Sequence, residues 1–251
     1  SAFSRGETVE DTVKVLQNFY DCIVLRTFAQ AKIEEVAACA DVPVINALTD
    51  AYHPCQILAD FLTIVEHGKQ LEGLKLTYVG DGNNMANTYL EGGALCGMHV
   101  RIASPEGYEV DPEVFAQCQA AADKYGTGAT LELMRDPVAA VEGADVVLTD
   151  TWTSMGDEAE HDMRVAAFQG YQVNAELMAH AAEGALFMHC LPAHRGEEVT
   201  DEVMRAPYSV IYDEAGNRLH AQKAVMSLLM GVPAPAAALE AAEAVAGRWH
   251  A

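Results

Sequence analysis

The chain has 251 residues, and its composition is that of a globular, strongly acidic protein. Hydrophobic residues make up 51% of it, enough to bury a sizeable core, which excludes a disordered, collagen-like or disulfide-stapled chain. Its 37 acidic and 15 basic side chains give a formal net charge of −22, which repels nucleic-acid phosphates and anionic lipid. We therefore expect no nucleic-acid partner and no membrane partner.

The N-terminus and the cysteines indicate a cytoplasmic protein. The first seven residues lack the architecture of a signal peptide, and the longest nearly apolar run, residues 224–239, is short for a membrane span and contains two prolines. The six cysteines are scattered without a C-x-x-C pair, which predicts free thiols. The low lysine content fits either a surface suited to high salt or an ordinary acidic cytosolic enzyme.

Apolar spacing predicts alternating helices and strands along most of the chain. In the first part the expected elements are a helix at 7–20, a strand at 22–28, a helix at 31–40, a strand at 42–48 and a helix at 56–67. The later strands are expected at 74–80, 98–105, 129–134, 145–152, 185–192 and 209–214. The later helices are expected at 83–97, 112–126, 136–144, 174–181 and 217–231. This alternation predicts an α/β fold with doubly wound parallel sheets.

We expect two such parallel-sheet domains, of which the first is incomplete. The boundary is placed near residues 50–70, with residues 1–60 in the first domain and 61–217 in the second. Residues 218–231 of the last predicted helix return to the first domain. The remaining segment, 232–251, is rich in Pro, Ala and Glu and forms a C-terminal extension that could contain one extra helix.

The segment Gly80-Asp-Gly-Asn-Asn84 lies between a predicted strand and a predicted helix, where backbone N–H groups attract polar or anionic ligands. Gly80 and Gly82 match the first two glycines of a dinucleotide fingerprint. Met85 stands in the place of the third, and the next strand leads into Ala103-Ser104 rather than into an acidic residue that could hold a ribose. The interpretation of the chain as a nucleotide-dependent oxidoreductase therefore rests on these two glycines alone. A structural turn needs only the glycines, so the asparagine doublet additionally indicates a ligand contact.

Asp150 ends a predicted strand, at the sheet edge where open α/β sheets bind ligands. The polar stretch after Gly156 predicts a mobile loop or a solvated connection. His53 precedes Pro54, which favours helix entry, and His53 either caps that helix or reaches a ligand.

The segment His189-Cys-Leu-Pro192 also follows a predicted strand. A zinc site at His189, Cys190 and His194 lacks a second pair of residues with metal-ligand spacing. The sequence lacks the G-x-S-x-G elbow, which disfavours a serine hydrolase. A catalytic Cys190 thiolate would need a nearby base.

Five segments together resemble the aspartate/ornithine carbamoyltransferase family in their order and spacing. They are His53–Gln56, Gly80–Asn84, Asp150–Gly156, His189–Pro192 and Asn217–His220. The Ser-Met-Gly sequence at 154–156 and Cys190 are similar to the ornithine branch of that family. The resemblance covers residues 5–231.

This resemblance implies transfer of the carbamoyl group of carbamoyl phosphate to the δ-amine of L-ornithine, giving L-citrulline and phosphate. It implies no metal and no organic cofactor, and assembly as a homotrimer or a multiple of trimers. Residues 1–60 would form a partial carbamoyl-phosphate-binding domain and residues 61–217 the ornithine-binding domain.

The resemblance also implies roles for individual side chains. Carbamoyl phosphate would be held by Arg26, His53, Gln56 and Arg218, with His53 and Gln56 polarising the carbamoyl group. Ornithine would be bound by Asn84, Asp150, Ser154 and Met155, and the reacting centre would be lined by Cys190 and Leu191. The expected catalytic residues are His53, Asp150, Cys190 and Arg218. A cis Leu191–Pro192 bond and closure of the loop around 153–162 are expected as well.

One motif of the family, Ser-Thr-Arg-Thr-Arg, does not occur in the sequence. We therefore expect the first α/β segment of the carbamoyl-phosphate domain to be missing. Just after that point Ala2 stands where the family usually has a polar residue for phosphate, and Ser4 replaces a usual glycine. Two further interpretations remain open, a non-catalytic ornithine-binding fragment and a related amino-acid or amine carbamoyltransferase.

Overall fold

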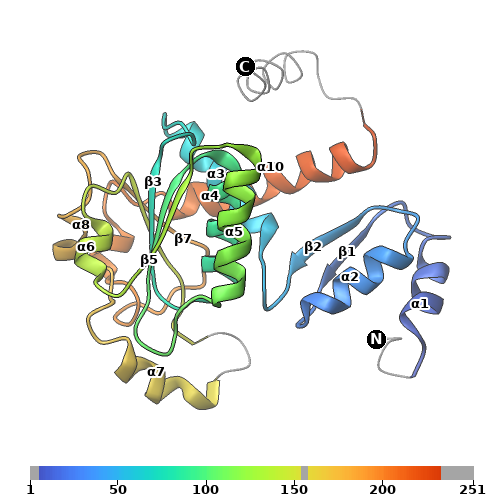
Figure 1. Cartoon of the computed structure of the whole chain (residues 1–251), viewed down its shortest axis with the longest axis horizontal. Helices are drawn as coiled ribbons and strands as arrows, with labels where there is room; N and C mark the ends of the chain where they lie inside the picture. Colours follow the sequence, from blue (N-terminus) through green and yellow to red (C-terminus); the bar gives the residue numbers. More distant parts are fainter. Residues whose placement is uncertain (1–5, 154–157, 233–251) are drawn as a thin grey trace. The chain divides into compact units, whose positions relative to one another are not determined.

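The computed structural model describes residues 6–153 and 158–232, and the chain divides into two compact units (Figure 1). Unit 1 comprises Ser1–Cys55 together with Leu219–Ala251, and unit 2 comprises Gln56–Arg218. Two helices, α3 (Pro54–Glu66) and α10 (Ile211–Leu229), contain residues of both units.

Unit 1 contains two parallel strands with two helices. Its elements are α1 (Val9–Leu16), β1 (Ile23–Arg26), α2 (Gln30–Cys39) and β2 (Val44–Leu48), and β1 pairs with β2 in parallel. The side chain of Thr8 accepts a hydrogen bond from the Asp11 backbone N–H, which satisfies a free donor at the start of α1. Val9, Val13 and Val36 form a small core between the two helices.

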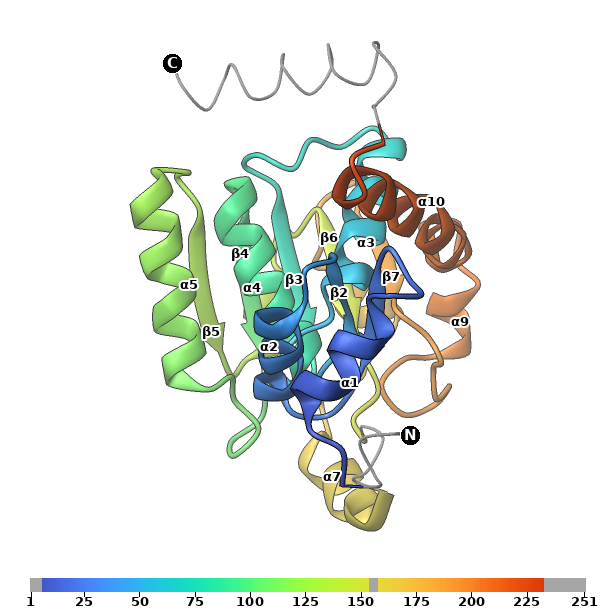
Figure 2. The same cartoon turned by 90° about the vertical axis from the view of Figure 1, so that its right-hand side faces the viewer.

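Unit 2 is built on five parallel strands in the order β5-β4-β3-β6-β7, side by side in Figure 2. The strands are β3 (Lys75–Val79), β4 (His99–Ala103), β5 (Thr130–Met134), β6 (Val146–Thr149) and β7 (Leu186–His189). Besides α3 and α10, the helices are α4 (Asn84–Cys96), α5 (Pro112–Tyr125), α6 (Pro137–Val141), α7 (His161–Ala167), α8 (Ala175–Met178) and α9 (Asp201–Met204), with a 3-10 turn at Glu158–Glu160.

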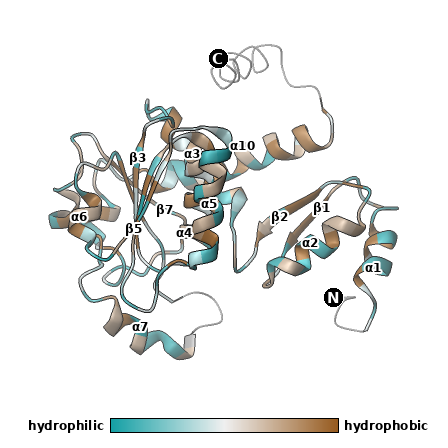
Figure 3. Cartoon of the chain, in the orientation of Figure 1, coloured by the Kyte–Doolittle hydropathy of each residue, from teal (hydrophilic) through white to brown (hydrophobic). Residues whose placement is uncertain are grey.

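Both faces of this sheet are buried along β3, β6 and β7, as is usual for parallel strands, whereas the edge strand β5 is partly exposed. In β6, Val146 and Leu148 belong to the core that includes residues of α3, α4 and α5. Val147 belongs to the core on the other face, with residues of α6, α8 and α9. Figure 3 shows apolar residues along the strands and both apolar and polar sides on helices such as α5. The predicted α/β fold with parallel sheets is confirmed.

The structure departs from the sequence expectation in three places. The predicted strand at 209–214 is wrong, because Ile211 begins α10 and Ser209 makes only an isolated bridge to Phe187. Val210 and Ile211 are buried in the two cores, so their β-branched side chains pack the start of a helix. Helices α7 and α9 were not expected.

Segment 154–157 and the predicted extra helix beyond residue 232 lie outside the described residues. Among the described helices, none combines the length and the apolar character needed to span a bilayer.

Candidate functional site

The strand order of unit 2 reverses between β3 and β6. The chain proceeds from β3 outward to β4 and β5, then returns to place β6 and β7 on the other side of β3. Connections leaving β3 and β6 therefore diverge at the carboxyl edge, where open α/β sheets bind ligands. Gly80–Asn84 follows β3 and Asp150 follows β6, so the topology places both predicted segments at this point.

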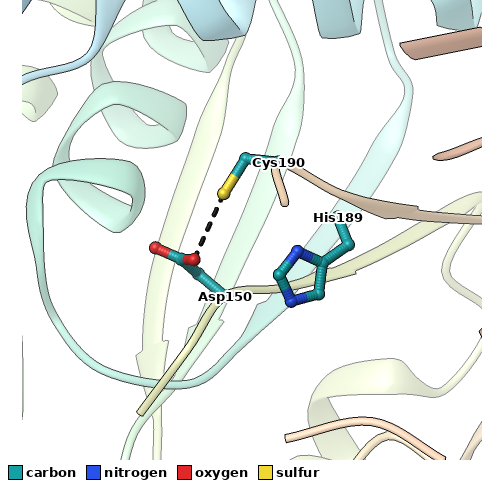
Figure 4. A group of neighbouring side chains, drawn as sticks. All are labelled: Asp150, His189 and Cys190. Carbon is teal, nitrogen blue, oxygen red and sulfur yellow. Dashed lines mark hydrogen bonds between the residues drawn. The ribbon is translucent and has the colours of Figure 1, made fainter. Parts of the chain in front are cut away.

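Asp150 lies among three hydrogen-bond donors. The Cys190 thiol donates to Oδ1 at 3.2 Å, as Figure 4 shows, and the Thr151 backbone N–H donates to the same oxygen at 2.7 Å. The Asn83 amide donates to Oδ2 at 3.2 Å. Two of these donors come from other loops, so the structure brings Asp150 and Cys190, which follow different strands, into direct contact.

The Cys190 environment favours the neutral thiol. Burial, followed by the negative charge of Asp150, raises the pKa of Cys190 well above its usual value. A thiolate nucleophile needs the opposite surroundings, a nearby cation or helix N-terminus. The geometry therefore argues against the thiolate alternative.

Asn83, the first residue of the asparagine doublet for which we expected a ligand contact, caps a helix in the structure. Its Oδ1 accepts from the backbone N–H groups of Met85 at 2.9 Å and Ala86 at 3.3 Å, which caps α4. This cap fixes the amide so that its NH2 group faces Asp150. The asparagine before a helical run was the available signal. Asn84, the predicted ligand residue, is the first residue of α4 and is half-buried.

Gly82 allows the β3–α4 loop to approach a neighbouring loop. A Cβ at this position would lie 2.3 Å from the backbone nitrogen of Val110. Such a contact is impossible without movement of one backbone. The glycine therefore has a packing role here that needs no dinucleotide ligand.

His189 braces the turn that follows β7. Its Nδ1 accepts from the Leu191 backbone N–H at 2.9 Å, so the ring proton is on Nε2, which faces Glu198 Oε1 at 3.2 Å. Glu198 is fully buried and also accepts from the His194 backbone N–H at 2.5 Å. The predicted cis Leu191–Pro192 bond is present, and Leu191 has a φ of 58°.

This use of the His189 ring does not fit a metal site. Ligand atoms of Asp150, His189 and Cys190 lie within 4.8 Å of one another, whereas His194 groups instead with Glu197 and Glu198. The zinc set of His189, Cys190 and His194, which the sequence disfavours, therefore does not form one cluster. Both nitrogens of His189 are engaged by protein groups, and the Cys190 thiol is stabilised in its protonated form.

A second set of site residues joins α3 to α10. The Gln56 Nε2 donates to Asp60 Oδ1 at 2.8 Å and to Glu214 Oε1 at 3.2 Å, while its carbonyl oxygen accepts from Arg218 Nη1. The Tyr89 hydroxyl donates to Asp60 Oδ2 at 2.6 Å. The two predicted residues Gln56 and Arg218 are therefore in direct contact.

Glu214 connects this set to the turn after β7. Its second oxygen, Oε2, accepts from the His189 backbone N–H at 2.9 Å, one residue before Cys190. Asp60, Tyr89 and Glu214 were not predicted. The available signal was the polar pair Gln56 and Asp60, which are four residues apart in a mostly apolar helix and therefore lie on one face.

Arg164 of α7 connects the segment after β6 to the loop after β3. Its guanidinium bonds the Asp81 carboxylate at 2.6 Å and the Trp152 carbonyl at 3.1 Å, and lies 5.1 Å from the centre of the Tyr108 ring. Residues 158–162, expected to be a loop, include a 3-10 turn and the start of α7.

The remaining predicted residues are placed as follows. Arg26 is the exposed last residue of β1, and His53 is buried immediately before α3, both within unit 1. Leu191 is half-buried and follows Cys190. Ser154 and Met155 lie outside the described residues. Unit 2 thus brings together Asp150 with Cys190 and Gln56 with Arg218.

Comparisons with known proteins identify both parts of the chain. Residues 1–66 match the family model of the aspartate/ornithine carbamoyltransferase carbamoyl-P binding domain, and residues 72–229 match that of the Asp/Orn binding domain. The chain is 56% identical over 226 residues to an ornithine carbamoyltransferase of Symbiobacterium thermophilum, covering 90% of this chain and 72% of that protein.

Solved structures agree with this match. The ornithine carbamoyltransferase of Gloeobacter violaceus superposes with a TM-score of 0.82 at 52% identity, covering 89% of this chain and 75% of the other. That of Pyrococcus furiosus gives 0.86 at 49% identity, covering 91% and 72%. An anabolic ornithine carbamoyltransferase of Campylobacter jejuni gives 0.86 at 38% identity, covering 92% and 76%.

Proposed function

This chain belongs to the aspartate/ornithine carbamoyltransferase family, and we propose that it transfers the carbamoyl group of carbamoyl phosphate to the δ-amine of L-ornithine. The products are L-citrulline and phosphate. The observation that carries this proposal is the Asp150–Cys190 contact at the strand-order reversal of unit 2. In support of the proposal, the Asp150 carboxylate, which suits a cationic amine, contacts the turn that follows β7. The His189 backbone N–H at the start of this turn donates a hydrogen bond to Glu214.

Ornithine would bind through Asn84, Asp150, Ser154 and Met155. A primary amine has an unperturbed pKa of about 10.4, so it arrives protonated and is attracted to the Asp150 carboxylate. It must lose one proton before its nitrogen attacks the carbamoyl carbon. Because burial and Asp150 keep Cys190 protonated, the acceptor is Asp150, the phosphate or water rather than Cys190.

Carbamoyl phosphate would bind through Arg26, His53, Gln56 and Arg218, the two arginines balancing the phosphate charge. The amide NH2 of Gln56 is directed to Asp60 and Glu214, so the group it offers is its carbonyl oxygen. This supports contact with the carbamoyl NH2 rather than polarisation of the carbamoyl oxygen, which then falls to His53. Stabilising the developing oxyanion is usually the largest catalytic contribution.

We place carbamoyl-phosphate binding in residues 1–60 with helix residues 218–231, and ornithine binding in residues 61–217. The phosphate contacts that we propose within this chain are Arg26 and Arg218. We further propose a cytoplasmic homotrimer, or a multiple of trimers, acting in arginine biosynthesis. The likeness to an anabolic enzyme supports that direction.

The test is to incubate the purified chain with both substrates and measure citrulline and phosphate, which should appear in equal amounts. Reactions lacking either substrate serve as controls, and aspartate, lysine and putrescine are offered as rival acceptors. A product from a rival amine alone would assign a related carbamoyltransferase. Ornithine binding by calorimetry, without carbamoyl-phosphate binding or any product, would instead assign a non-catalytic fragment.

A further inference from the structure

Two carboxyl groups lie in the interior of unit 2, next to Gln56, one of the predicted substrate residues. Asp60 on α3 and Glu214 on α10 are both 0% exposed. They contact the same nitrogen, Nε2 of Gln56, at 2.8 and 3.2 Å. Neither is assigned a role by the reaction described above.

The surroundings can stabilise one negative charge on this pair but not two. The groups that face it are Gln56 from α3, the Tyr89 hydroxyl from α4, Arg218 from α10, and the His189 N–H with the Cys190 thiol after β7. Arg218 is the one cation among them. Within the part of the chain that the structure describes, no second cation is found beside the pair, and two adjacent carboxylates with one cation cannot both ionise in a buried site, so one keeps its proton.

The donors select which carboxyl is ionised. Asp60 accepts from the Tyr89 hydroxyl at 2.6 Å and from Gln56 at 2.8 Å, whereas the oxygen of Glu214 near Gln56 has the longer contact of 3.2 Å. Burial raises the pKa of Asp60 to about 6, and burial together with the charge of Asp60 raises the pKa of Glu214 well above its usual value. Near pH 7 the arrangement is therefore an Asp60 carboxylate beside a Glu214 carboxylic acid.

We propose that Asp60 and Glu214 share one proton and act as positioning residues, holding Gln56 so that its oxygen faces Arg218 and its NH2 group faces the pair. This inference rests on the proposed function, because Gln56 and Arg218 are the residues assigned there to carbamoyl phosphate.

The orientation of Gln56 matters because the two ends of an amide are nearly equal in shape and opposite in hydrogen bonding. With a carboxylate behind it, the NH2 group is fixed toward the pair and the oxygen toward Arg218. If the pair carried no negative charge, the reversed amide would become accessible, presenting NH2 to the cationic Arg218. Carbamoyl phosphate would then bind less tightly, while the Asp150 side of the site would stay unchanged.

The test compares Glu214→Gln with the double variant Asp60→Asn/Glu214→Gln. The single variant replaces a neutral acid by a neutral amide and keeps the Asp60 charge, so the KM for carbamoyl phosphate should stay within about threefold of wild type. The double variant removes the charge and should raise that KM at least about tenfold, equivalent to about 1.4 kcal/mol. The KM for ornithine should not change in either. Asp213→Asn, an exposed carboxylate beside Glu214, is the matched control and should behave as wild type.

The shared proton is measured directly by infrared difference spectroscopy near pH 7. The wild type should show the band of a protonated carboxyl that is absent from Glu214→Gln, and this readout needs no catalysis. Persistence of the band, or equal KM values for carbamoyl phosphate in the single and double variants, would overturn the proposal. A wild type that makes no citrulline would refute the proposed function instead, and the infrared result would still decide the protonation of the pair.

Discussion

Replacing Asp150 by asparagine tests the carboxylate at the centre of the site. The change keeps the shape of the side chain but removes its charge. In the native protein both oxygens accept, from Thr151 and Cys190 on one side and from Asn83 on the other. An asparagine must direct its NH2 group at one of these donors, so the variant loses an acceptor as well as the charge.

The magnitude follows from the value of a hydrogen bond to a charged group, about 1.5–3 kcal/mol. At about 1.4 kcal/mol per factor of ten, kcat/KM for ornithine should fall roughly 10- to 150-fold. The KM for carbamoyl phosphate should change little. Asp123→Asn, which removes an exposed carboxylate on α5, is the charge-matched control and should leave both parameters unchanged.

A second assay of the same variant does not depend on catalysis. The charge of Asp150 and the hydrogen bond that it accepts both raise the pKa of Cys190. Asp150→Asn should therefore lower that pKa toward its usual value and increase the fraction of thiolate. Alkylation of Cys190 by iodoacetamide, followed by mass spectrometry across a pH series, should start at lower pH than in wild type. Unchanged alkylation together with unchanged kcat/KM would refute the assigned contact.

Three further changes test the framework of unit 2. Gly82→Ala would force a Cβ within 2.3 Å of a neighbouring backbone and should cost about 1–3 kcal/mol in urea unfolding, whereas Gly216→Ala, which meets nothing within 4 Å, should not destabilise. Arg164→Met removes the ion pair with Asp81 and should cost about 1–3 kcal/mol, with amide exchange increasing first in α7; unchanged exchange there would exclude the anchoring role. The pKa of Asp60 rises from 3.8 to about 6 on folding, so the native state retains a proton that the unfolded chain has lost. This stabilisation is complete below 3.8 and is lost as the pH rises through about 6, so Asp60→Asn should show a weaker fall in unfolding free energy over that range.

The sequence was sufficient where a residue's neighbours along the chain determine its structure. Alternating apolar runs predicted β3 to β7, and the turn residues after β3 and β6 indicated the carboxyl edge. The strand expected at 209–214 failed because Val210 and Ile211 are β-branched yet start a helix. Their preference was overridden by burial against both cores, which local spacing cannot reveal.

Contacts between distant segments were beyond the same reasoning. Asp60 and Glu214 are 154 positions apart, and each alone is an ordinary acidic residue in a helix. Only the packing of α3 against α10 places both on Gln56. The role of Arg164 likewise could not be predicted, because its ion-pair partner Asp81 lies in another loop, 83 positions earlier in the chain. The substrate-binding and catalytic roles of all the predicted site residues remain predictions.

The hydrogen bonds of His189 have a consequence for how the site meets its ligands. Because one ring nitrogen receives the Leu191 N–H and the other faces the buried Glu198, the conformation of this turn is set when the protein folds. Because the turn after β7 is already ordered, a substrate that binds beside it spends little of its binding free energy on ordering the turn. Loosening the ring, for example by Glu198→Gln, should therefore act as an entropic penalty on association, visible in calorimetry as a less favourable entropy.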